Sequence, residues 1–71
     1  MATIYTTDGQ VIRDQLQGCR SPGGLPGEAL DTAWRLIDGE YSAMVLHDDD
    51  GWWFIDQRWH PRQIPRPVWA K

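Results

Sequence analysis

The densest polar cluster in the sequence is a run of three aspartates, Asp48 to Asp50, followed by Gly51. Carboxylates followed by glycine are typical of calcium-binding loops, because calcium prefers oxygen ligands. The spacing does not fit an EF-hand: with this glycine sixth, the first and twelfth positions would be a leucine and a glutamine, where an aspartate and a bidentate glutamate belong. We therefore predict no metal site, and interpret the run as a solvated polar turn or an acidic knob for protein binding.

The other residues with reactive side chains are Cys19, His47 and His60. Cys19 lies in a glycine-rich loop beside Arg20, whose positive charge would lower the pKa of the thiol. A nucleophilic cysteine or serine also needs a base and an oxyanion site, and the sequence indicates neither. The two histidines lack further ligands at metal-binding spacing. We therefore predict a protein that is not an enzyme and that has no catalytic residue and no cofactor.

Charge is distributed unevenly along the 71 residues, whose net charge is −3. The segment from Glu28 to Asp56 holds eight acids and one arginine, whereas the segment from Gln57 to Lys71 holds four cations and no acid. An acidic surface steers association with a basic partner. Because a duplex-binding domain is normally basic, we expect no direct nucleic-acid contact. No apolar run approaches the ~20 residues of a membrane span, so we expect a cytoplasmic protein without membrane contact.

Turn residues divide the chain into short elements. Residues 3–7 and 10–17 are predicted to form a hairpin around Asp8-Gly9, although a helix capped by Thr7 is an alternative for the second segment. A loop rich in glycine and proline follows. A helix is predicted from Pro26 to Asp38, with Gly39 as its C-cap. Its apolar face consists of Leu30, Ala33, Trp34 and Ile37.

Residues 41–47 and 52–59 are predicted to form a second hairpin that turns at Asp50-Gly51. Alternation then gives each strand two apolar faces, one with Met44, Leu46, Trp53, Ile55 and Trp59, and the other with Tyr41, Val45, His47, Trp52 and Phe54. A sheet covered by one helix normally has one polar face. Since one helix cannot cover both faces, we expect one apolar face of the sheet to lie outside the helix contact.

The tail from His60 onward alternates three prolines with arginines, which excludes a helix or a central strand. We predict an α+β protein with a single domain over residues 1–59, in which one helix packs on an antiparallel sheet in the order ββαββ. Residues 60–71 are predicted to be an extended basic arm. This arm could fold back over the second sheet face, with Ile64, Val68 and Trp69 as apolar anchors.

Five tryptophans are more than a core of this size needs. Core packing accounts for Trp34 and Trp53. The others are explained by a protein-binding patch, by contact with the C-terminal arm or by a homodimer interface, because tryptophan is enriched at interface hot spots.

In its size, its acidity and its combination of one helix with hairpins, the chain resembles the small phage-encoded inhibitor proteins, anti-CRISPR proteins among them. The resemblance is one of overall profile, with no shared residue motif. It implies a protein without catalytic activity that occupies a nucleic-acid-binding or partner surface of a host complex such as a CRISPR effector.

We therefore predict a non-enzymatic protein-binding module that docks an acidic and aromatic surface on a basic site of a larger host protein. That surface would comprise the acids Asp48, Asp49 and Asp50, the aromatic anchors Trp52, Phe54 and Tyr41, and the rim residues Glu40 and Asp38. One alternative is an assembly subunit that self-associates through its aromatic sheet face. Another is a nucleic-acid contact through Arg58, Arg62 and Arg66.

Overall fold

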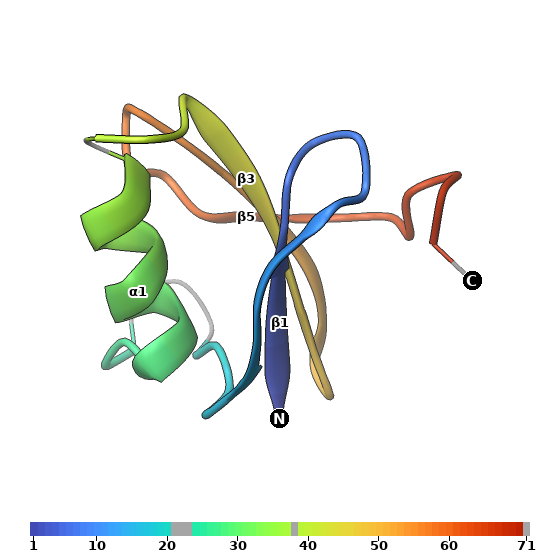
Figure 1. Cartoon of the computed structure of the whole chain (residues 1–71). Helices are drawn as coiled ribbons and strands as arrows, with labels where there is room; N and C mark the ends of the chain where they lie inside the picture. Colours follow the sequence, from blue (N-terminus) through green and yellow to red (C-terminus); the bar gives the residue numbers. More distant parts are fainter. Residues whose placement is uncertain (21–23, 38, 71) are drawn as a thin grey trace.

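The protein is described by a computed structural model for residues 1–20, 24–37 and 39–70 (Figure 1). The elements follow in the order β1 (Ala2–Tyr5), β2 (Val11–Leu16), α1 (Glu28–Ile37), β3 (Ala43–Asp48), β4 (Gly51–Asp56) and β5 (Arg62–Ile64). The strands form one antiparallel sheet in the order β2-β1-β3-β4-β5. Helix α1 packs on β1 and β3 from one side of this sheet (Figure 1). The predicted α+β class is confirmed.

A fifth strand corrects the predicted ββαββ order. β5 lies within the segment that we expected to be an extended arm, and it pairs with β4 through Arg62 opposite Phe54 and Ile64 opposite Trp52. Pro61 and Pro65 flank this strand. Proline has no N–H to donate to a neighbouring strand, so the two prolines keep β5 short and at the edge of the sheet.

The first hairpin forms as a hairpin rather than as the alternative helix, but its turn differs from the prediction. The backbone N–H of Thr6 donates to the carbonyl of Gln10 (2.8 Å), which leaves a three-residue loop instead of the expected two-residue one. Gly9 closes this loop with φ +100°, a conformation that glycine adopts without steric cost. The longer loop is accompanied by two register shifts between β1 and β2.

The second hairpin turns one residue earlier than predicted. Asp48 pairs with Gly51, so Asp49 and Asp50 form the turn. The carboxylate of Asp48 accepts the backbone N–H of Asp50 (2.8 Å), which is the Asx arrangement that favours a turn at this point. Moving the turn by one residue changes the register by two, so the side chains within β3 and β4 keep their predicted faces.

The core lies between α1 and one face of the sheet, and includes Ile4, Met44, Leu46, Trp53 and Ile55 from the strands and Ala29, Leu30, Ala33, Leu36 and Ile37 from the helix. Trp34 corrects the prediction, because its side chain is 49% exposed. The face of the helix that contacts the sheet is centred on Ala29, Ala33 and Leu36. Trp34 is left at the margin, where it packs edge to face on Trp59 with ring centroids 4.6 Å apart.

The start of α1 is held against the end of β2. The backbone N–H of Ala29 donates to the carbonyl of Gln17 (3.1 Å), and the Glu28 carboxylate accepts the Gln17 N–H (3.0 Å). The two backbones approach so closely that a Cβ on Gly27 would lie 1.6 Å from the carbonyl oxygen of Gly18. Only glycine fits there. No helix in the described ranges is long and apolar enough to cross a membrane.

We expect Gly27→Ala to lower the free energy of unfolding by about 3 kcal/mol, because the helix must move away from Gly18. Gly39→Ala is the matched control, since a Cβ at Gly39 meets no atom within 4 Å, and it should change stability by no more than about 0.5 kcal/mol. Urea denaturation followed by circular dichroism measures both. Equal stability of the two variants would contradict the close approach.

Candidate functional site

The sheet face opposite α1 is the most unusual surface of the protein. In Figure 1 the helix lies on one side of the sheet, and the residues after β5 run out on the other. The opposite face carries Tyr5, Val45, His47, Trp52 and Phe54, of which only Val45 is fully buried. The sheet therefore has a second apolar face as predicted, and most of its side chains keep part of their surface exposed.

Four rings form one cluster on this face, which we call the aromatic cluster: Tyr5, His47, Trp52 and Trp69. The rings of His47 and Trp52 are stacked, with centroids 3.9 Å apart and planes 14° from parallel. Trp69 lies 5.1 Å from Tyr5 and meets Trp52 edge to face at 5.7 Å. Stacked and edge-to-face rings stabilise each other beyond the area they bury.

Trp69 is bound to the first hairpin. Its indole N–H donates to the carbonyl of Thr7 (3.0 Å), and a Cβ on Gly9 would lie 2.9 Å from the ring. Glycine is thus needed at this position both for its positive φ and for the contact with the indole. Of the three expected anchors, Trp69 reaches the sheet face and Ile64 lies in β5, whereas Val68 is fully exposed.

An apolar groove lies beside the aromatic cluster, between the sheet face and residues 65–69. Its cavity volume is about 400 Å³, and its walls include Val45, Phe54, Ile64, Pro67 and Trp69. We call it the arm groove. Two arginines flank it: Arg66 is part of its lining, and the guanidinium of Arg62 lies 5.0 Å from the centre of the Phe54 ring.

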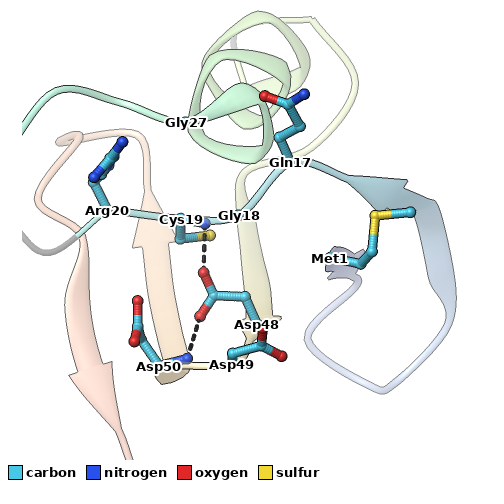
Figure 2. A pocket seen from close by; sticks show the side chains of 9 residues that line it. All are labelled: Met1, Gln17, Gly18, Cys19, Arg20, Gly27, Asp48, Asp49 and Asp50. Atoms are coloured by element: carbon cyan, nitrogen blue, oxygen red, sulfur yellow. Dashed lines mark hydrogen bonds between the residues drawn. The ribbon is translucent and has the colours of Figure 1, made fainter.

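Asp48 is buried, whereas the two aspartates that follow it in the sequence are exposed. Its side chain is only 7% exposed, and its carboxylate accepts the backbone N–H groups of Cys19 and Asp50 (Figure 2). It therefore ties the loop after β2 to the β3–β4 turn. The expected role of Asp48 in steering a partner needs an exposed carboxylate, and its burial corrects that prediction. Asp49 and Asp50 are exposed at the tip of the hairpin.

The remaining predicted residues do not extend the same surface. Tyr41 packs against the core on the helix side of the sheet, whereas the prediction placed it on the face of Trp52 and Phe54. Glu40 is exposed after α1 and precedes β3, so it lies at the opposite end of that strand from the Asp49-Asp50 tip. Asp38 lies outside the described residues.

The thiol of Cys19 also corrects an expectation. Burial, together with the negative charges of Asp48 and Asp50, raises its pKa to about 12. The neighbouring Arg20 is exposed and does not produce the expected lowering of this pKa. The thiol is 4% exposed and is held protonated, which is the opposite of a reactive cysteine. Within the described ranges, no three His, Cys, Asp or Glu side chains are grouped to hold a metal ion.

Both edges of the sheet are poor sites for adding a strand. The edge strand β2 has an irregular register, and Gln15 within it has φ 59°. The other edge strand, β5, has three residues between prolines. Irregular, short and proline-flanked edges disfavour pairing with another chain. A partner would therefore bind the sheet face more readily than a sheet edge.

Sequence reasoning missed Tyr5, which contacts both Trp52 and Trp69. Its contribution depends on β1 lying in the middle of the sheet beside β3, a pairing between segments about forty residues apart. The alternation of the apolar residues Ala2 and Ile4 with Thr3 and Tyr5 is a sequence signal that could have assigned its face.

Comparisons of the chain with protein-family models, with curated proteins and with solved structures find no match.

We expect Cys19 to be alkylated by iodoacetamide at about pH 8 at least about a hundredfold more slowly in the folded protein than in concentrated urea. A pKa three units above the ordinary thiol value leaves on the order of a thousandfold less thiolate. Arg20→Gln should leave the folded-state rate unchanged. Equal rates with and without urea would contradict the burial of this thiol.

Proposed function

We propose that the protein is a non-enzymatic protein-binding module whose contact surface is the sheet face opposite α1. The observation that carries this proposal is the aromatic cluster, which lies on the sheet face that α1 leaves uncovered. Trp52 lies at its centre, in contact with His47, Tyr5 and Trp69 while still partly exposed. Partly exposed aromatic rings on a rigid sheet are the residues that most often dominate protein interfaces.

The acidic tip of the β3–β4 hairpin supports a basic partner site. Asp49 and Asp50 are exposed, and Trp52 follows them directly at the start of β4. Exposed charges at the rim of an interface accelerate association, whereas the buried rings at its centre supply most of the affinity. In this proposal the acidic tip steers the protein to a basic site and Trp52 anchors it there.

An inhibitory role would follow from the same contact. If the basic site of the host protein normally binds nucleic acid, the acidic tip and the aromatic cluster would compete for it. Self-association through the aromatic cluster is the second candidate, because the same exposed rings could meet those of another copy. Capture of a host protein and sedimentation across concentration distinguish the two candidates.

We expect Trp52→Ala to lose the partner that the wild-type chain captures from a host lysate, because it removes the central ring of the contact surface. Trp34→Ala is the matched control, since Trp34 is also exposed but lies on the helix side. A protein lost from both variants, or from neither, would contradict the proposed surface. Sedimentation at several protein concentrations measures the oligomeric state in parallel. If the wild-type chain self-associates and Trp52→Ala does not, the assembly-subunit alternative is favoured.

We expect the double substitution Asp49→Asn/Asp50→Asn to slow association with the captured partner several-fold at low salt and to reduce the salt dependence of the association rate. The dissociation rate should change little, because both side chains are exposed. Stopped-flow mixing across ionic strength measures these rates. Asp48 is left intact, so the loop that it holds is preserved. An unchanged association rate would refute steering by the tip.

A further inference from the structure

The arm groove differs in chemistry from the aromatic cluster. The cluster is nearest to the acidic tip, whereas the groove has Arg66 in its lining and Arg62 above the Phe54 ring. No acidic side chain belongs to the groove lining within the described residues. The chain as a whole carries a net charge of −3, so this cationic border is a local feature rather than a consequence of composition.

The walls of the groove suit an apolar side chain. Val45, Phe54 and Ile64 form its floor on the sheet, and Pro67 and Trp69 belong to the segment that faces them. A cavity of about 400 Å³ is within the range of sites that enclose small ligands or single side chains. The prolines restrict the backbone of this wall, and the Trp69–Thr7 hydrogen bond holds its far end. A wall held in place before binding loses little entropy on binding.

The two arginines indicate which chemical group of a ligand would lie beside the apolar side chain in the groove. A guanidinium offers several N–H donors in a plane, which suits a carboxylate. Arg62 lies over Phe54 with its side chain exposed, and Arg66 is also exposed, so both retain donors for a ligand. An acidic peptide segment is favoured over a nucleic-acid strand, because two arginines on a chain of net charge −3 do not form the basic patch that a nucleic acid normally needs.

We propose that the arm groove binds an acidic peptide segment of the partner protein, with an aromatic side chain of that segment inserted between Phe54 and the 65–69 wall and a neighbouring carboxylate on Arg66. This inference rests on the proposed function and deepens it. The partner then presents a basic site to Asp49 and Asp50 and an acidic, aromatic segment to the arm groove. The opposite charges at the two places set the orientation in which the partner docks.

The test uses three capped peptides and the full chain: acetyl-Glu-Phe-Glu-amide, its neutral analogue acetyl-Gln-Phe-Gln-amide, and acetyl-Glu-Ala-Glu-amide, which lacks the ring. Each is titrated into isotope-labelled protein and followed by NMR. We expect the first peptide to shift the Val45 and Ile64 methyl signals and the Trp69 indole signal. The neutral peptide should bind about threefold to fivefold more weakly, as for one partly exposed ion pair, and the peptide without the ring should leave these signals unmoved.

Arg66→Gln removes the lining charge without touching the core, and should equalise the affinities of the charged and neutral peptides. Arg13→Gln is the matched control, because Arg13 is exposed on β2, at the far edge of the sheet, and should preserve the difference. Equal binding of both peptides to the wild-type chain, or shifts confined to residues outside the groove, would overturn the inference. Failure of the proposed function is distinguishable, since it is measured with Trp52→Ala, and Trp52 does not line the groove.

Discussion

The fold depends on a mismatch of size between one helix and its sheet. Five strands spaced about 4.8 Å apart form a sheet roughly 20 Å wide, and a ten-residue helix about 15 Å long covers part of one face. The helix is held by its contacts with β1 and β3 and by the close approach of Gly27 to Gly18. Nothing comparable to a second helix covers the other face in the described ranges, so its side chains must bury one another.

On the second face, aromatic side chains bury one another and take the place of a second layer of helices. His47 stacks on Trp52, Tyr5 fills the space beside them, and Trp69 returns from the end of the chain to close the cluster. This arrangement leaves the rings partly exposed, because α1 covers only the other face of the sheet. Stability and binding thus draw on the same residues: the aromatic cluster that completes the fold is also the surface we assign to a partner.

Two exposed regions of the protein carry charges of opposite sign. The β3–β4 tip displays Asp49 and Asp50, while the β5 edge and the residues after it display Arg62 and Arg66. Asp48, although adjacent in sequence to the tip, is committed to two backbone N–H groups and takes no part in this division. A run of identical residues therefore splits into one structural carboxylate and two that are free to meet a partner.

The local patterns of the sequence were sufficient for the helix, both hairpins and the presence of two apolar faces, because spacing and turn residues act over a few positions. Four features needed the tertiary structure. Trp34 lies at the margin of the core against Trp59, and Asp48 is buried by a loop 29 residues away. β5 formed because the exposed edge of β4 offered unpaired backbone groups, and Trp69 joined Tyr5 across the whole chain. Each depends on contacts between distant segments, whose geometry no local pattern encodes.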